Sequence, residues 1–182
     1  MSTRASFLFP KDASAALDAI KSKTDIKDDA DIIRLALSAF DCLLELDELS
    51  CKIFVRDRER REWPYSPHLR FVYPGLTDVA EEKLDDSLEK RSNGVHAKNF
   101  FFSGPAVQRL KAIRARSEMS TNGDAIRVAL TKFNQLLQVE TTGDSVVVRD
   151  LKGHESLFNL FNPQARRQLC TSAKSMAAEP AI

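Results

Sequence analysis

Features that would indicate a membrane protein or a secreted protein are missing from this sequence of 182 residues. No apolar run approaches the roughly 18 residues of a membrane-spanning helix. The N-terminal Met-Ser-Thr-Arg-Ala-Ser lacks the apolar core of a signal peptide. There are only three cysteines, and Cys42, Cys51 and Cys170 form no Cys-x-x-Cys pattern. We therefore expect a cytoplasmic protein with reduced cysteines and no contact with a membrane.

Motifs of catalysis are missing as well. The sequence has no Gly-rich phosphate-binding loop, no nucleophile motif and no pairing of acidic residues beyond helix caps and helix faces. The histidines, His68, His96 and His154, stand apart and lack the spacing of metal ligands. We expect no enzyme, no cofactor and no bound metal.

An internal repeat with a displacement of 93 positions is the strongest feature present. Residues 124–137, DAIRVALTKFNQLL, match residues 31–44, DIIRLALSAFDCLL. The same register holds without a gap between residues 7–57 and 100–150, where 17 of the 51 pairs are identical. Because most identical pairs are apolar, the two copies share chiefly a core. Repeats of this kind decide how the whole fold is interpreted.

Composition and charge describe an ordinary globular protein whose copies differ at the surface. The chain is 43% apolar and 29% charged, and its length suits one domain or two small ones. Residues 1–57 carry 8 basic and 11 acidic side chains, whereas residues 93–150 carry 8 and 5. Such an asymmetry bears on partners rather than on the fold.

Hydrophobic periodicity predicts the same order of elements in each copy: strand, short helix, long helix and a β-hairpin. In the first copy these are expected at residues 6–9, 11–22, about 30–47, and 51–56 paired with 69–73. In the second copy they are expected at residues 97–102, 105–116, about 121–139, and 145–149 paired with 155–161. We assign residues 1–75 and 95–162 to the two units, residues 76–94 to a solvated connecting helix, and residues 163–182 to a disordered tail with one helical turn at 165–169.

This order of elements, with Asp-x-Ile-Arg-x-Ala-Leu-x-x-Phe-x-x-Leu-Leu on the long helix, resembles the ribbon-helix-helix superfamily of Arc, MetJ and CopG repressors and many antitoxins. The resemblance covers residues 5–46 and 98–139. In that family two units pair their N-terminal strands into a ribbon that enters the DNA major groove. Two units in one chain are similar to single-chain accessory proteins of T-DNA transfer. The resemblance implies an α+β, mainly α, pseudo-dimer whose two units form one joint domain.

Packing also favours pairing of the two N-terminal strands. A lone strand leaves its backbone unpaired, and a two-helix unit of this size cannot bury its apolar stripe alone. Because side chains alternate along a strand, an antiparallel pair has an inward and an outward face. The phenylalanines matched between the copies are expected to face inward: Phe7, Phe9, Phe100 and Phe102. The outward positions are then Arg4, Ser6, Leu8, Ala97, Asn99 and Phe101.

The outward set departs from the pattern of the family. Base edges are recognised by hydrogen-bond donors and acceptors, which Leu8 and Phe101 lack. Three roles stay open for this apolar pair: contact with thymine methyl groups, a wedge against DNA, or a docking face for another surface. Arg4, Ser6 and Asn99 are suited to base contacts.

The family also anchors a DNA phosphate at the N-terminus of the long helix, where free N–H groups and the helix dipole favour an anion. In the second copy Ser120, Thr121 and Asn122 predict a small, neutral N-terminus. In the first copy the carboxylates of Asp28 and Asp29 would oppose a phosphate. The short helix and the strand region of the second copy also carry a group of basic side chains, and we expect this copy to face DNA. They are Lys98, expected to precede the strand, with Arg109, Lys111, Arg114 and Arg116.

Each of these residues has a structural interpretation too. A basic stripe at 109–116 is also typical of a solvated helix face, and Ser or Thr at 120–121 of an ordinary N-cap. Arg34 and Arg127 match between the copies and are expected to form ion pairs. Trp63 and Tyr65 either stack on bases or pack on the domain.

We therefore expect a bacterial DNA-binding protein, either a regulator of transcription or an accessory factor of DNA transfer or partition. It would bind double-stranded DNA as a monomeric pseudo-dimer or as higher oligomers on DNA. The alternative is a protein-interaction module, antitoxin-like or an assembly adaptor, that has lost DNA readout. Its protein partner would dock on Leu8 and Phe101 or on the acidic first unit.

Overall fold

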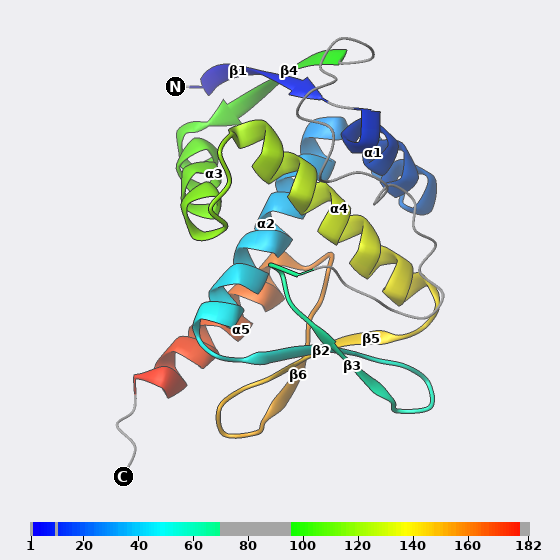
Figure 1. Ribbon diagram of the computed structural model, residues 1–182, viewed down its shortest axis with the longest axis vertical. Coiled ribbons are helices and arrows are strands. Elements are labelled where there is room, and N and C mark those ends of the chain that lie inside the picture. The colour runs from blue at the N-terminus through cyan, green and yellow to red at the C-terminus, as the bar shows by residue number, and fades with distance from the viewer. Residues whose placement is uncertain (1, 10, 70–95, 179–182) are drawn as a thin grey trace.

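The computed structural model describes residues 2–9, 11–69 and 96–178. In these ranges the fold is α+β and mainly helical, as the sequence predicts (Figure 1). The elements in chain order are β1 (Ser2–Phe9), α1 (Lys11–Lys23), α2 (Asp29–Glu48), β2 (Lys52–Arg56), β3 (Glu62–Tyr65), β4 (His96–Ser103), α3 (Gly104–Arg116), α4 (Asn122–Thr141), β5 (Ser145–Arg149), β6 (Glu155–Leu157) and α5 (Pro163–Ala177).

Two antiparallel sheets lie at opposite ends of the molecule. At one end β1 pairs with β4, and at the other a four-stranded sheet has the order β3-β2-β5-β6. Figure 1 shows α2 and α4 crossing between the two sheets, with α1 and α3 on the flanks. The long helices begin near the β1–β4 ribbon and end beside the four-stranded sheet, while α5 lies along α2.

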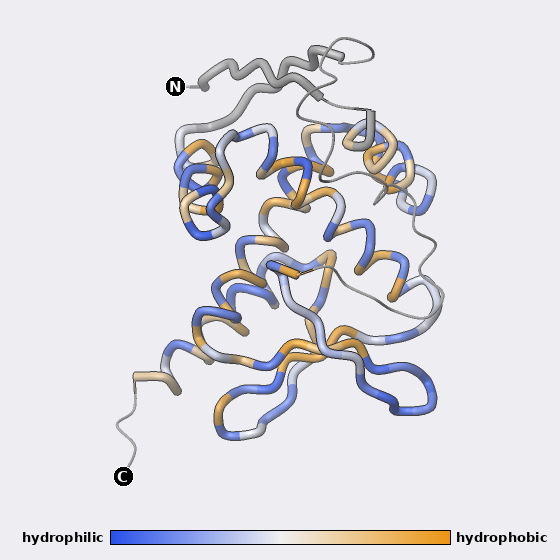
Figure 2. The backbone as a smooth tube through the Cα atoms, viewed as in Figure 1, coloured by the Kyte–Doolittle hydropathy of each residue, from blue (hydrophilic) through white to orange (hydrophobic). Residues whose placement is uncertain are grey.

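The core is built from the apolar stripes that the sequence predicts. In α2 the stripe from Ile33 to Leu44 is fully buried, and α4 buries the equivalent stripe from Ile126 to Leu137. The predicted stripe of α1 is buried too. A buried leucine or phenylalanine contributes roughly 1.5–3 kcal/mol, so packing between the copies holds the helices together. Figure 2 shows the apolar residues gathered on the facing sides of the helices and at the centre of the sheet.

In both sheets the central pair joins residues that are equivalent in the two copies of the repeat. In the ribbon Ser6 lies opposite Asn99, and in the larger sheet Phe54 lies opposite Val147. Each of these pairs joins residues 93 positions apart. Equivalent residues therefore meet at the centre of both sheets, as they would on the twofold axis of a dimer.

The hairpin partner expected for β2 at residues 69–73 is wrong. The partner is β3, and residues 70–73 lie outside the described part of the chain. Pro64 argues against a central strand, but β3 is an edge strand, where a missing N–H is tolerated. In the second hairpin β6 ends at Leu157, earlier than the expected residue 161.

The two hairpins have the same turn, although none of residues 58–61 is identical to its equivalent in residues 151–154. Asp57 Oδ1 accepts a hydrogen bond from the N–H of Arg61 at 2.8 Å, and Asp150 Oδ1 accepts one from the N–H of His154 at 2.9 Å. The four residues form two pairs that are again 93 positions apart. The repeat thus continues beyond residue 57, through segments whose sequences have diverged.

Charged side chains cover the outer face of the larger sheet. The guanidinium groups of Arg56 and Arg149 lie 5.2 and 4.6 Å from the ring centre of Phe54. Each arginine also contacts Glu62 and Glu155. This arginine–glutamate tetrad shields Phe54, which is only 5% exposed.

The expected disordered tail is also corrected, because α5 continues for 15 residues. Asn162 caps it through hydrogen bonds from the N–H groups of Gln164 and Ala165, and Pro163 occupies its first turn. Arg166, Cys170 and Ala173 are buried against the rest of the fold. The connecting helix expected at residues 76–94 lies outside the described residues.

Candidate nucleic-acid interface

The β1–β4 ribbon carries the positions predicted to contact DNA bases. Directly opposite residues of an antiparallel pair share a face, and neighbours along a strand alternate. The register pairs Ser6 with Asn99 and Arg4 with Phe101, so these four positions share one face. Leu8 and Ala97 are paired on the same face. The register thus divides the ribbon as the sequence predicts.

This register corrects the prediction for Lys98. Lys98 lies within β4, which begins at His96, and so it does not precede the strand. Lys98 lies opposite Phe7. It therefore shares a face with the phenylalanine positions and not with Ser6 and Asn99.

The N-terminus of α4 is capped by Thr121, whose hydroxyl accepts a hydrogen bond from the N–H of Asp124 at 3.1 Å. The Asp124 carboxylate accepts hydrogen bonds from the hydroxyl groups of Thr121 and Ser120, at 2.6 and 3.2 Å. Burial raises the pKa of Asp124, but these donors outweigh burial and leave the pKa below its usual value. The expectation of a neutral N-terminus overlooked this carboxylate.

The N-terminus of α2 is more acidic and its donors are occupied. The Asp28 carboxylate accepts hydrogen bonds from the N–H groups of Ala30 and Asp31, at 2.6 and 3.2 Å. In α4 the equivalent cap is a hydroxyl, and within the described part of the chain the N–H groups of Asn122 and Gly123 have no acceptor. The predicted difference between the two helix ends therefore persists, with α4 the better anion site.

Two of the predicted DNA-binding arginines are engaged within the protein. Arg116 pairs with Asp41 at 2.9 Å and with Glu48 at 3.4 Å, and Arg109 pairs with Asp41 at 3.3 Å. Both carboxylates belong to α2, so basic side chains of the second copy neutralise acidic side chains of the first. Part of the charge difference between the copies, which we related to partners, therefore forms ion pairs within the fold.

The remaining basic residues of α3 differ in their surroundings. The guanidinium of Arg114 is half-buried and donates a hydrogen bond to the side-chain oxygen of Asn122 at 3.3 Å. It therefore connects the end of α3 to the start of α4. Lys111 is exposed. Of the four predicted residues in this helix, Lys111 is the one best placed to meet a partner.

Two structural interpretations from the sequence are confirmed. Arg34 pairs with Asp31 at 2.5 Å, and Arg127 pairs with the equivalent Asp124 at 3.7 Å. Both arginines thus neutralise a carboxylate at a helix N-terminus. Tyr65 is buried in the core, which excludes base stacking by its ring, and Trp63 is half-buried with the Arg61 guanidinium 5.3 Å from its ring centre.

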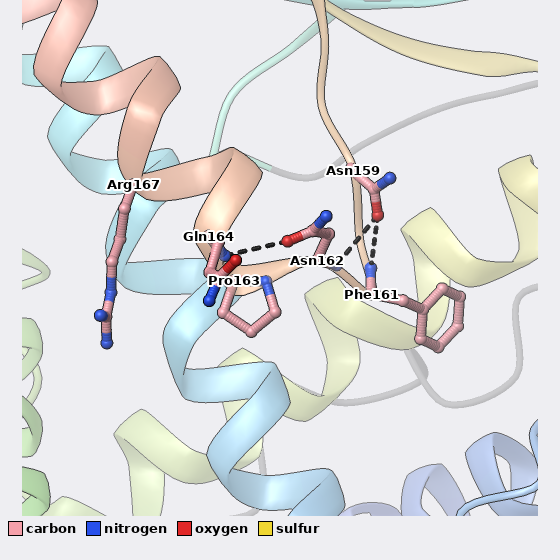
Figure 3. Close-up of a pocket in the computed structure, with 6 residues that line it drawn as sticks. All are labelled: Asn159, Phe161, Asn162, Pro163, Gln164 and Arg167. Atoms are coloured by element: carbon pink, nitrogen blue, oxygen red, sulfur yellow. Dashed lines mark hydrogen bonds between the residues drawn. The ribbon is translucent and has the colours of Figure 1, made fainter.

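A shallow depression beside the start of α5 has a structural explanation (Figure 3). Asn159 Oδ1 accepts hydrogen bonds from the N–H groups of Phe161 and Asn162, and Asn162 in turn caps the helix. The side-chain oxygens of the two asparagines that line the depression therefore form the hydrogen bonds of the turn into α5. Sequence reasoning expected a single helical turn after Asn162-Pro163 and missed the length of the helix, although Asn-Pro is a typical start of a helix.

The comparisons with known proteins add nothing to this geometry. The chain matched no protein-family model, no curated protein and no solved structure. None of the described helices combines the length and apolarity that crossing a bilayer requires.

Proposed function

We propose that this chain is a DNA-binding protein of the ribbon-helix-helix type, in which the two copies form a covalent pseudo-dimer. The observation that supports this most directly is the pairing of Ser6 with Asn99, two equivalent residues at the centre of the β1–β4 ribbon. A homodimer of this type pairs the same residue of each subunit at that point. The expected role is that of a regulator of transcription or an accessory factor of DNA transfer or partition.

The proposed DNA contact has two parts. The ribbon face with Arg4, Ser6, Asn99 and Phe101 would enter the major groove. The open N–H groups at the start of α4 would hold a phosphate, since α4 begins near the ribbon (Figure 1). We leave Arg109 and Arg116 out of the DNA-binding residues that the sequence predicts, because both form ion pairs with Asp41 of α2.

Fluorescence anisotropy with random duplex and single-stranded DNA tests this proposal. Affinity that rests on phosphate contacts should fall steeply between about 50 and 200 mM salt. We expect micromolar or tighter binding to the duplex at the lower salt concentration. Absence of binding to either DNA at that concentration would refute the proposal.

Asn122→Asp tests the phosphate contact without weakening the fold. The new carboxylate still accepts the hydrogen bond from Arg114, and a negative charge stabilises a helix N-terminus. It opposes a phosphate, so we expect duplex affinity to fall by about three- to tenfold. The matched control is Asn162→Asp at the start of α5, which should bind DNA like the wild type. Equal affinities for the two variants would exclude α4 from the interface.

A protein-docking role for the ribbon is the second candidate. It is favoured by the register, which places the apolar Leu8 and Phe101 on the same face as Ser6 and Asn99. Phe101→Asn separates the two functions. A ribbon that wedges Phe101 against DNA loses duplex affinity in this variant. A ribbon that docks a protein shows no duplex binding in either form, and loses its partner when Phe101 is replaced.

A further inference from the structure

Two cysteines that lie 128 positions apart in sequence meet in the fold. Cys42 lies on α2 and Cys170 on α5, and both are about 5% exposed. Their sulfur atoms approach to 2.6 Å. The fold thus brings together two cysteines that form no Cys-x-x-Cys pattern in the sequence. No sequence spacing could reveal this contact, because it depends on the full length of α5 and on its packing against α2, which were not predicted.

The two helices align their side chains position by position. Above the cysteines the Arg166 guanidinium donates a hydrogen bond to Ser38 Oγ at 3.2 Å. Below them Lys174 forms an ion pair with Glu45. On α5 the contacts fall at residues 166, 170 and 174, and on α2 at residues 38, 42 and 45, which is the spacing of one face of each helix. Packing on both sides thus fixes the two thiols in register.

Both thiols border a cavity although they are buried. A cavity of about 250 Å³ lies between α2, α3 and α5, and both cysteines line it. Its rim includes charged side chains of Asp41, Arg109 and Lys174, and the hydroxyl of Thr171. The two sulfur atoms therefore border a space whose rim is polar and charged.

A buried cation lies next to the pair. Arg166 is 1% exposed and donates to the carbonyl groups of Asn159 and Leu160, and within the described residues it has no carboxylate in ion-pair contact. Burial lowers the pKa of Arg166, and the neighbouring Cys42 and Cys170 oppose that shift. A positive charge beside a thiol favours its reactive thiolate form. The neighbouring Cys42 thiol and burial raise the pKa of Cys170, so reaction should accelerate with rising pH.

We propose that Cys42 and Cys170 are a redox-active pair that forms a disulfide in the presence of an oxidised low-molecular-weight disulfide such as oxidised glutathione. One cysteine thiolate attacks the reagent, forms a mixed disulfide and releases one glutathione thiolate. The second cysteine thiolate then attacks the protein sulfur of that mixed disulfide and releases the other glutathione. Two protein thiols are oxidised to one disulfide, and one glutathione disulfide is reduced to two thiols.

The consequence is a covalent attachment of α5 to α2. In the reduced protein α5 is held by packing and by the polar contacts on either side of the cysteines. In the oxidised protein the disulfide closes a loop that contains the whole second copy. The redox state of the surroundings would therefore set how firmly the C-terminal helix is held.

The test is equilibration of the full reduced chain with mixtures of oxidised and reduced glutathione, followed by thiol titration and non-reducing peptide mapping. We expect two of the three thiols to be lost and one peptide to link Cys42 with Cys170. Cys51→Ser is the matched control and should form the same link. Retention of all three thiols, a stable glutathione adduct, a link through Cys51 or a link between two chains would each overturn the proposal.

A second measurement covers the event that a cysteine variant does not fold. In the wild-type chain, oxidation should raise the midpoint of thermal unfolding by roughly 5 °C or more, since a disulfide that closes a long loop stabilises the folded state. The rise should disappear when dithiothreitol is added. In Cys170→Ser, where it folds, oxidised glutathione should give no rise. An unchanged midpoint in the mapped, oxidised protein would contradict the proposed attachment of α5.

Discussion

Arg116 in the second copy of the repeat donates a hydrogen bond to Asp41 in the first copy across 2.9 Å. This contact joins α3 to α2, and Arg109 reaches the same carboxylate. The opposite net charges of the two copies are thus in part a means of holding them together. For the proposed nucleic-acid partner, these ion pairs leave less positive charge on Arg109 and Arg116 than on the exposed Lys111.

The first prediction concerns the carboxylate at this contact. Burial raises the pKa of Asp41, and the attraction of Arg116 and Arg109 does not fully offset it. Asp41→Asn removes the half-buried charge and keeps an acceptor, so it should change the free energy of unfolding by less than about 1 kcal/mol. Arg116→Glu brings three carboxylates together and should cost roughly 2–3 kcal/mol. Urea unfolding measures both, and equal costs would contradict this account.

The second prediction compares equivalent residues after the two long helices. Ser50 and Gly143 are 93 positions apart and both have a left-handed backbone, with φ of 58° and 81°. A residue with a Cβ is strained there, whereas glycine is not. We expect Ser50→Gly to stabilise the fold and Gly143→Ser to destabilise it, by about 0.5–1 kcal/mol in opposite directions. Thermal unfolding of both variants checks the signs, and a shared sign would refute the argument.

The third prediction concerns the cap of α4. Thr121→Ala removes the acceptor for the N–H of Asp124 and should cost about 1 kcal/mol. Thr121→Ser keeps that acceptor and should cost much less. Chemical denaturation measures stability, and anisotropy with duplex DNA measures binding on the same samples. If only Thr121→Ala were to lose stability while both variants bound DNA equally, the cap would be structural and not a phosphate contact.

The fourth prediction concerns the arginine–glutamate tetrad at acidic pH. Hydrogen bonds from Arg56 and Arg149 lower the pKa of Glu155 from 4.5 to about 2. A pKa that is lower in the folded state stabilises the fold above pH 4.5, and this stabilisation is lost as the pH falls towards 2. The wild type should therefore unfold at a higher temperature than Glu155→Gln at neutral pH, with the difference disappearing near pH 2.

The control for this pH dependence is Glu118→Gln, an exposed carboxylate between α3 and α4. It lies outside the tetrad, and its removal should leave the acid limb of the stability profile close to that of the wild type. A profile for Glu155→Gln that runs parallel to the wild type down to pH 2 would contradict the proposed role of the two arginines.

Helix positions and the core could be predicted because local sequence determines them. The apolar stripe of α2 has helical spacing, and its duplicate in α4 confirms the register. The pairing of β1 with β4 could be predicted as well, since neither strand can satisfy its backbone alone. These elements combine local periodicity with the repeat.

The features that were missed depend on contacts distant in sequence. The position of β3 contradicts ordinary strand preferences, because Pro64 is acceptable only at a sheet edge that the sequence does not reveal. Extending the displacement of 93 to Glu62 and Glu155 would have found it. The helix α5 has modest apolar content, and its stability comes from packing on α2. The engagement of Arg116 by Asp41 likewise needs the relative placement of two helices.

The pairing of equivalent residues within one chain has a consequence for how the protein can change. In a homodimer every substitution occurs twice, once on each side of the symmetry axis. Here a substitution at Ser6 leaves Asn99 as it is, so each half can specialise independently. Pairing is also intramolecular, and dilution does not separate the two halves. A chain built in this way can recognise a target whose two halves differ, which a symmetric dimer is poorly suited to do.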